Sequence, residues 1–404
     1  MAAIAGCSGD GGESTPTETA ANTPEPTTEE PTTEEETTAE PEKPDPTATE
    51  NALIEPATYK EWYDAGIVNT DDPYGDRVTT IRVDTDGYDA GHVPGAVKWA
   101  SADNEGPAAL TEAREEGLAT STKTMIIRGS IVDEIIQNAG VGPNTVIVLT
   151  GAAPMRIARA YWTLRFWGFP RERVKVLNGG PTAYKEEYTL SYEEPSTPDI
   201  NYTVEAFEEP NYELREGLNE MIQLVDQKNA GEIDDAFLDL RGPGQDATLA
   251  GTTADPPSTY LQADSFTADA PWEDAQTIQD HVFGLDGVSD GKHIVTYCGS
   301  GYRAAMGFFA LDGILGYDNV SLYDGSFSRQ WQYYNGEQDP VPNDAWRVDK
   351  QGRTEGEVTA TDLAIDPELN DQLTELAQLE ANQVKKAAIE YIVGSTSGDF
   401  GCGS

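Results

Sequence analysis

A strand–loop–helix–strand pattern occurs twice in the chain, and it limits the fold more than any other feature. The first copy has a β-branched strand, a helical pattern and a second strand, at residues 146–149, 156–167 and 174–177. The second copy repeats this order, at residues 294–297, 304–315 and 320–323. In both copies the same interval separates the first strand from a Gly-aromatic pair. Short β-branched strands that alternate with helices are typical of parallel sheets. The sequence therefore predicts an α/β protein with two tandem domains, each a parallel sheet flanked by helices.

The two copies also predict the domain organisation. At 404 residues the chain is long enough to bury two cores. We expect an N-terminal domain at 51–190 and a second domain at 204–340, joined by a polar, proline-containing linker at 191–203. A helical extension is expected at 341–404, because apolar residues recur at helical spacing in 367–393. We expect that apolar face to pack against the domains, with a partner helix as the alternative.

The first 50 residues differ from the rest of the chain. Ile4-Ala-Gly-Cys7 resembles a lipobox, whose cysteine thiol receives lipid. Residues 8–50 are dominated by Thr, Glu, Pro, Ala and Ser, and such a segment cannot offset its chain entropy by burying apolar surface. We expect a disordered stalk that tethers a globular body outside a cell membrane through Cys7. Because no charged and apolar signal-peptide regions precede Cys7, this interpretation places the true start upstream of Met1 or implies a truncated sequence. The alternative is an acidic tail on a cytoplasmic protein.

The net charge of −46 restricts the partners of this chain. Residues 1–50 hold 13 acidic residues and one lysine, so most of the negative charge belongs to the remainder. An acidic surface repels nucleic acid and anionic membranes. We therefore expect no nucleic-acid partner, and hypothesise adaptation to high salt, which screens such repulsion. A merely acidic protein from an ordinary environment is the alternative.

Cysteine and histidine are scarce. Three cysteines are too few for a disulfide scaffold, and His92, His281 and His293 show no metal-ligand spacing. No strand leads into a glycine-rich dinucleotide or phosphate motif. The longest apolar runs are too short to span a membrane. We therefore predict no metal and no cofactor. We also expect a monomer whose partners are small molecules.

The loop after the first strand of the second copy carries the candidate site. Residues 298–303 read Cys-Gly-Ser-Gly-Tyr-Arg and lie between a strand and a helix. Loop amides and a helix N-terminus favour negative charge there, and Arg303 adds a cation. We predict Cys298 as a nucleophile and the rest of the loop as the substrate-binding residues Gly299, Ser300, Gly301, Tyr302 and Arg303. A cysteine that is only a small buried side chain is the alternative. Thr150 occupies the matching position in the first copy, which predicts one catalytic domain and one scaffold domain.

Five motifs in order resemble the rhodanese superfamily over residues 54–331. They are an Asp-bearing strand and a Gly-His-Val-Pro-Gly-Ala signature in the first half, then a second Asp-bearing strand, the six-residue loop and a final Asp-Gly-Ser-Phe-Ser motif, at 83–85, 88–96, 238–241, 298–303 and 323–328. The last motif is similar to that of tandem thiosulfate and mercaptopyruvate sulfurtransferases.

This resemblance implies two tandem rhodanese-like domains and a ping-pong reaction. Cys298 would take the outer sulfur of a donor as a persulfide and pass it to cyanide or a thiol. The resemblance also implies that Arg241 binds substrate, that the inactive half helps form the cleft, and that His92 belongs to a structural turn.

The donor depends on a few positions. Gly299 and Ser300 resemble mercaptopyruvate enzymes, Arg303 resembles single-domain rhodaneses, and Gln245 replaces an arginine that tandem enzymes often carry. We predict thiosulfate, with mercaptopyruvate as the alternative. A cysteine phosphatase is disfavoured because five residues separate its cysteine and arginine, whereas four do so here. A non-catalytic sulfur carrier or binding module at the cell surface is the remaining alternative.

Overall fold

The computed structural model describes residues 43–331, except 71–76, 117–118, 208–209, 246–247, 250–251 and 264. Cys7, Cys402, most of the expected stalk and the expected helix at 367–393 lie outside the described residues. Residues 43–50, assigned to the stalk from composition, are described: Pro46 is buried and Asp45 accepts a hydrogen bond from the Thr47 hydroxyl. The described residues belong to one compact unit.

The first half contains a five-stranded parallel sheet with the strand order β1-β7-β6-β2-β3. Its strands are β1 (Leu53–Ile54), β2 (Arg77–Arg82), β3 (Ala96–Lys98), β6 (Thr145–Thr150) and β7 (Val174–Leu177). Its helices are α1 (Pro56–Asp64), α2 (Gly129–Asn138), α3 (Pro154–Phe166) and α4 (Gly180–Glu187). Every residue of β6 is buried, as its run of β-branched residues predicts for a central parallel strand.

The second half contains another five-stranded parallel sheet, in the order β10-β9-β11-β12-β8. Its strands are β8 (Arg215–Glu216), β9 (Ala236–Asp239), β10 (Thr252–Ala254), β11 (Ile294–Tyr297) and β12 (Val320–Tyr323). Its helices are α5 (Leu218–Asn229), α6 (Ala275–Val282) and α7 (Tyr302–Phe308), followed by π-helical segments at Phe309–Ile314 and Phe327–Trp331. Short 3₁₀ turns occur at 88–90, 106–109, 171–173, 204–207, 212–214 and 257–260.

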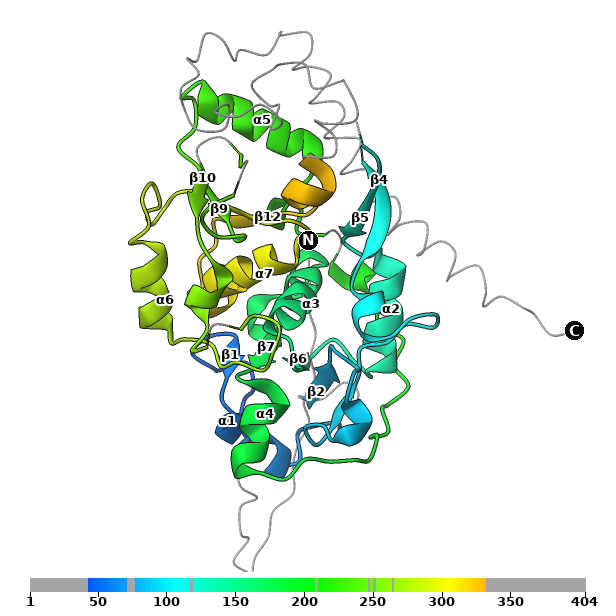
Figure 1. The fold of residues 1–404 in the computed structure, drawn as a ribbon. Coiled ribbons are helices and arrows are strands. Elements are labelled where there is room, and N and C mark those ends of the chain that lie inside the picture. The colour runs from blue at the N-terminus through cyan, green and yellow to red at the C-terminus, as the bar shows by residue number, and fades with distance from the viewer. Residues whose placement is uncertain are drawn as a thin grey trace, which may run out of the picture. The chain divides into compact units, whose positions relative to one another are not determined.

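Alternate residues of β6 face two different cores. Val146 and Val148 pack with side chains of α1 and α4, whereas Ile147 and Leu149 belong to a larger core on the opposite face. This larger core continues through α3 into α7 and β12 of the second half. Figure 1 shows α3 and α7 next to each other between the two halves. The two sheets are therefore joined by shared apolar packing.

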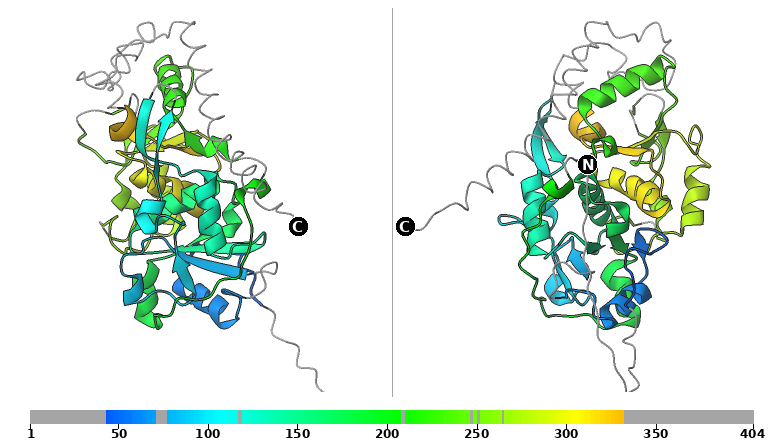
Figure 2. Two further views of the ribbon diagram at one scale, coloured as in Figure 1. Left: turned by 90° about the vertical axis from the view of Figure 1, so that its right-hand side faces the viewer. Right: turned by 180° about the vertical axis from the view of Figure 1, so that it is seen from behind.

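An antiparallel hairpin, β4 (Glu112–Glu116) and β5 (Ala119–Met125), is added to the first half. Figure 2 shows it beside the last described segment of the second half. The Gln330 side-chain amide donates to the Thr122 hydroxyl across this contact, at 3.3 Å. The hairpin thus reaches the part of the second half that supports the candidate loop.

The predicted α/β fold with two parallel sheets is confirmed. The helix expected at 304–315 begins two residues earlier, at Tyr302, and becomes π-helical at Phe309. The numerical domain boundaries stay predictions. Among the described residues, no helix has the length and apolar character needed to cross a membrane.

Candidate active site

Cys298 lies at the carboxyl end of β11, in the short loop before α7. Its side chain is only 1% exposed, and it is the one free cysteine among the described residues. The Ser300 N–H donates a hydrogen bond to the Cys298 sulfur at 3.4 Å. At least one loop amide thus points at the sulfur, as the glycine-rich sequence predicts.

The segment after β12 holds this loop from the side. The Ser326 hydroxyl accepts a hydrogen bond from the Cys298 N–H at 3.2 Å, and the Phe327 N–H donates to the Cys298 carbonyl at 2.8 Å. The N–H groups of Ser328 and Arg329 both donate to the Gly299 carbonyl. Ser326 adopts a left-handed φ of 54°, which is uncommon outside glycine. The Asp-Gly-Ser-Phe-Ser motif therefore fixes the backbone around Cys298.

Gly301 lies directly before α7 and has a backbone conformation that requires glycine. Its φ is 81°, and a Cβ at this position would lie 2.7 Å from Nη1 of Arg159 and 2.8 Å from the Asp324 carbonyl oxygen. Arg159 comes from α3 of the first half. The candidate loop is thus packed directly against a side chain of the other domain.

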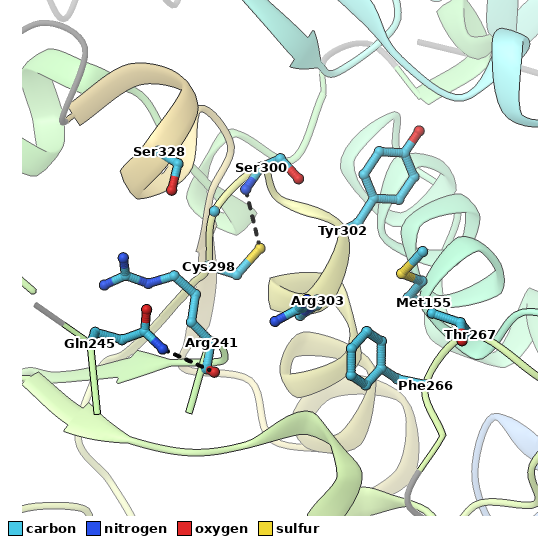
Figure 3. A pocket seen from close by; sticks show the side chains of 11 residues that line it. Met155, Arg241, Gln245, Phe266, Thr267, Cys298, Ser300, Tyr302, Arg303 and Ser328 are labelled. Carbon is cyan, nitrogen blue, oxygen red and sulfur yellow. Dashed lines mark hydrogen bonds between the residues drawn. The ribbon is translucent and has the colours of Figure 1, made fainter. Parts of the chain in front are cut away.

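A cavity of about 440 Å³ opens at the thiol. Its lining combines residues of both halves: Met155, Arg241, Gln245, Phe266, Thr267, Cys298, Gly299, Ser300, Tyr302, Arg303 and Ser328. Figure 3 shows Arg241, Gln245 and Ser328 on one side of Cys298, with Tyr302, Met155 and Phe266 on the other. The cavity can therefore offer polar groups on one side of the sulfur and apolar contacts on the opposite side.

Arg241 faces this cavity, but an adjacent carboxylate pairs with its charge. Its Nε and Nη2 donate to the buried Asp239 carboxylate at 2.9 and 2.6 Å, and its guanidinium lies 4.0 Å from the Phe327 ring centroid. Burial alone lowers the pKa of Arg241, but Asp239 raises it above its usual value. Arg241 is therefore a fixed cation whose field is partly neutralised.

Arg303 presents its charge differently. Its guanidinium lies over the Phe266 ring, 4.4 Å from the centroid. Within the part of the chain that the structure describes, no carboxylate pairs with it. A cation held on an aromatic face keeps its donors available to an anion. Arg303 is therefore the better placed of the two arginines to hold an anionic donor.

Six of the seven predicted catalytic and substrate-binding residues line this one cavity. The seventh, Gly301, belongs to the same loop but contacts Arg159 and Asp324 instead of the cavity. Their chemical roles stay predictions. Sequence reasoning missed Met155, Phe266, Thr267 and Ser328. Ser328 belongs to a motif that resembled the family, and this was the signal that could have found it. The others come from segments with no recognisable pattern.

The matching loop of the first half is closed. Asp84, two residues after β2, accepts a hydrogen bond from the Ala152 N–H at 2.7 Å. A Cβ on Gly151 would lie only 1.9 Å from the same Asp84 oxygen, so the carboxylate fills the concave side of this loop. Burial raises the pKa of Asp84. Because Asp84 fills this loop and Thr150 has no thiol, only the second of the two matching loops, residues 298–303, carries a thiol.

His92 lies in a buried turn. Its ring nitrogens contact the carbonyl oxygens of Tyr88 and Glu193, at 3.1 and 3.0 Å, and the ring stacks on Tyr88. This geometry agrees with the structural turn expected from the sequence. No group of three or more metal-ligating side chains occurs among the described residues.

The chain is similar in sequence to proteins whose names refer to sulfur transfer. A rhodanese-like domain model matches residues 222–332, which include the candidate loop. The protein named "Putative thiosulfate sulfurtransferase" from Haloferax volcanii is 26% identical over 271 residues, covering 65% of this chain and 87% of the relative. The sulfur carrier protein TtuD of Thermus thermophilus is 27% identical over 269 residues, covering 63% and 88%. These relatives support sulfur transfer as the general activity.

A solved 3-mercaptopyruvate sulfotransferase from Escherichia coli has a similar fold. Its TM-score is 0.52 at 20% identity, and the match covers 69% of this chain and 99% of that protein. The yeast Tum1 protein matches with a TM-score of 0.51 at 18% identity, over 71% and 96% of the two chains. At such identities the likeness concerns the fold alone. Residues 222–332 therefore contain a rhodanese-like domain, and the chain as a whole has the fold of tandem rhodanese-type proteins.

Proposed function

We propose that the protein transfers sulfane sulfur from thiosulfate to cyanide or a thiol through a persulfide on Cys298. The observation that carries this proposal is the position of the thiol. It borders a cavity that Arg241 and Arg303 also line, and its sulfur accepts a hydrogen bond from the Ser300 N–H at 3.4 Å. A sulfur nucleophile in such surroundings suits a reaction whose donor and leaving group are both anions.

The proposed reaction has two balanced steps. The Cys298 thiolate attacks the outer sulfur of thiosulfate, so that a new S–S bond forms while the old S–S bond breaks and sulfite leaves with its electron pair. In the second step, cyanide attacks the outer sulfur of the persulfide. A C–S bond forms, thiocyanate leaves, and the Cys298 thiolate is regenerated. A thiolate acceptor would react in the same way and leave as a persulfide.

The two cations support thiosulfate as the donor. A small dianion needs concentrated positive charge near the reacting sulfur, and Arg303 carries a charge with no carboxylate partner among the described residues. Gln245 lines the cavity where a second arginine would help to hold a carboxylate. The name of the Haloferax relative points to the same donor.

Two alternatives have their own support. The apolar side of the cavity, with Met155, Phe266 and Tyr302, favours an organic donor such as 3-mercaptopyruvate. The second alternative is a protein that carries sulfur without turnover on small donors, and the name of the Thermus relative favours it.

Steady-state assays with thiosulfate and with 3-mercaptopyruvate, in low and molar KCl, test the proposal. Thiocyanate should form from thiosulfate and cyanide, and mass spectrometry should find one added sulfur atom on Cys298. Cys298→Ser should fold normally and form no thiocyanate, since its hydroxyl cannot hold sulfane sulfur. A catalytic efficiency at least ~10-fold higher with 3-mercaptopyruvate, equivalent to about 1.4 kcal/mol, would reverse the donor choice. Sulfur loading without turnover would favour the carrier.

We also propose that lipid on Cys7 holds the protein at the outer face of a membrane. Support comes from the lipobox-like sequence and the stalk composition. Mass analysis of the N-terminal peptide from native membranes should find a lipidated Cys7. Recovery of a free Cys7 thiol from soluble cytoplasm would contradict this location.

A further inference from the structure

A buried arginine of the first half lies directly behind the candidate loop. Arg159, on α3, is fully buried, and its Nη2 donates to Oδ1 of Asp324 at 2.6 Å. The same nitrogen also donates to the Thr124 carbonyl at 3.2 Å. Its Nε and Nη1 have no hydrogen-bond partner among the described residues. An unpaired buried donor costs free energy, so the ion pair with Asp324 does not by itself account for the burial of this guanidinium.

The unpaired edge of Arg159 faces the loop that carries Cys298. Its Nη1 lies where a side chain on Gly301 would project, and its guanidinium carbon is 6.0 Å from the Tyr302 ring centroid. The plane of the guanidinium is held by the Trp162 ring, at 4.4 Å. Arg159 therefore forms a rigid support under the last turn of the loop and the start of α7.

Asp324, which pairs with Arg159, also belongs to the segment that binds the other side of the loop. Asp324 also accepts hydrogen bonds from Nε of Arg215 at 3.0 Å and from the Ile126 N–H at 2.8 Å. It starts the segment whose Ser326 and Phe327 bind the backbone of Cys298. One ion pair between the halves thus connects both sides of the loop.

We propose that Arg159 is a positioning residue for sulfur transfer: it holds the 298–303 loop so that its amides point at the Cys298 sulfur. The inactive half would then contribute to the reaction through this side chain. This inference rests on the proposed function, and it concerns a residue that does not line the cavity. Its loss should therefore lower kcat for persulfide formation and leave KM for the donor nearly unchanged.

The same helix offers a matched control. Arg165 also reaches across to the second half, where its Nε and Nη2 donate to the buried Asp312 carboxylate at 2.9 and 3.0 Å. When Arg165 is replaced, Asp312 still pairs with Arg171. When Arg159 is replaced, Asp324 still pairs with Arg215. None of the contacts described for Arg165 involves residues 298–303. Replacing either arginine thus removes one buried ion pair between the halves, but only Arg159 supports the loop.

The experiment compares Arg159→Met, Arg159→Lys and Arg165→Met with the wild type. For each, the unfolding temperature, kcat and KM with thiosulfate and cyanide, and the rate of Cys298 alkylation by iodoacetamide are measured. We expect both methionine variants to lose stability. In Arg159→Met, kcat should fall on the order of ten- to a hundredfold per folded molecule, because small displacements of a reacting group cost that much. Alkylation should also slow, since the Ser300 amide no longer faces the sulfur. Arg165→Met should keep the wild-type kcat and alkylation rate.

Arg159→Lys covers the case in which Arg159→Met fails to fold. Lysine can keep the ion pair with Asp324 but cannot fill the space under Gly301 with a planar group. We expect this variant to fold, with a reduced kcat and an unchanged KM. A wild-type kcat and alkylation rate in Arg159→Lys, or equal values in Arg159→Met and Arg165→Met, would overturn the positioning role. If the wild type itself transfers no sulfur, the proposed function fails, while the alkylation rates still decide the role of Arg159.

Discussion

Replacing Gly301 with alanine should be one of the most damaging single-methyl additions in the described structure. Two separate costs combine at this position. The φ of 81° lies in the left-handed region, and the added Cβ would meet Arg159 Nη1 at 2.7 Å and the Asp324 carbonyl oxygen at 2.8 Å. Neither neighbour can retreat easily, because Arg159 is bound to Asp324 and that carbonyl is backbone.

The expected loss of stability follows from these two costs. The left-handed conformation costs a non-glycine residue about 1–2 kcal/mol. Overpacking against fixed neighbours adds about 1–3 kcal/mol. Gly301→Ala should therefore lower the free energy of unfolding by about 2–5 kcal/mol, and kcat should fall with it because the loop must move.

Gly231 provides the control, since its φ is 73° and no atom would lie within 4 Å of its Cβ. Gly231→Ala should cost only the conformational part, and the entropy that alanine removes from the unfolded chain is the same in both variants. Urea unfolding followed by fluorescence measures both free energies. If Gly301→Ala proves no less stable than Gly231→Ala, within ~0.5 kcal/mol, the close packing under the loop does not limit this position.

Three further predictions concern charge. Arg303→Ala should raise KM for thiosulfate roughly tenfold or more, since it removes charge-assisted bonds of about 1.5–3 kcal/mol, and steady-state kinetics would contradict this by showing an unchanged KM. Burial alone raises the pKa of Asp312, but Arg165 and Arg171 hold it below its usual value. The stability that Asp312 adds is therefore complete above about pH 4 and is lost as the pH falls through the folded pKa. The free energy of unfolding of Asp312→Asn should accordingly fall less steeply with acid than that of the wild type, and an equal slope would refute this. The free energy of unfolding should rise toward molar KCl, and a flat or falling series would refute salt adaptation.

The fold could be predicted from the sequence because its signals are local. The strands β6, β7, β11 and β12 are short β-branched runs at repeated intervals, and the structure places each within one residue of its expected bounds. The loop at residues 298–303 was less clear from local signals, because a cysteine after a strand is more often only a small buried side chain. The motifs that surround it, which resemble the rhodanese superfamily, favoured the nucleophile instead. The π-helical segment at Phe309–Ile314 was not foreseen, because hydrophobic periodicity does not separate it from an α-helix.

The cavity beyond the loop could not be read in the same way. Met155 and Phe266 reach it from different halves of the chain, and only the packing of α3 against α7 brings them together. The pairing of Arg241 with Asp239 is different, because residues two apart at the end of a strand face the same side. That spacing was visible in the sequence and would have lowered the expected contribution of Arg241 to substrate binding.

The ion pairs between the halves explain why a domain without a thiol can still matter for sulfur transfer. In the first half, the Asp84 carboxylate takes the loop amide of Ala152, so this loop has no free amide at that point to offer an anion. In the second half, Asp239 lies at the corresponding strand end but binds Arg241 instead, and the Ser300 amide stays directed at Cys298. The first half then acts through α3, whose Arg159 supports the loop while Met155, one turn earlier, lines the cavity. Under the proposed function, the second half thus supplies the loop that carries the thiol, and the first half holds that loop in place.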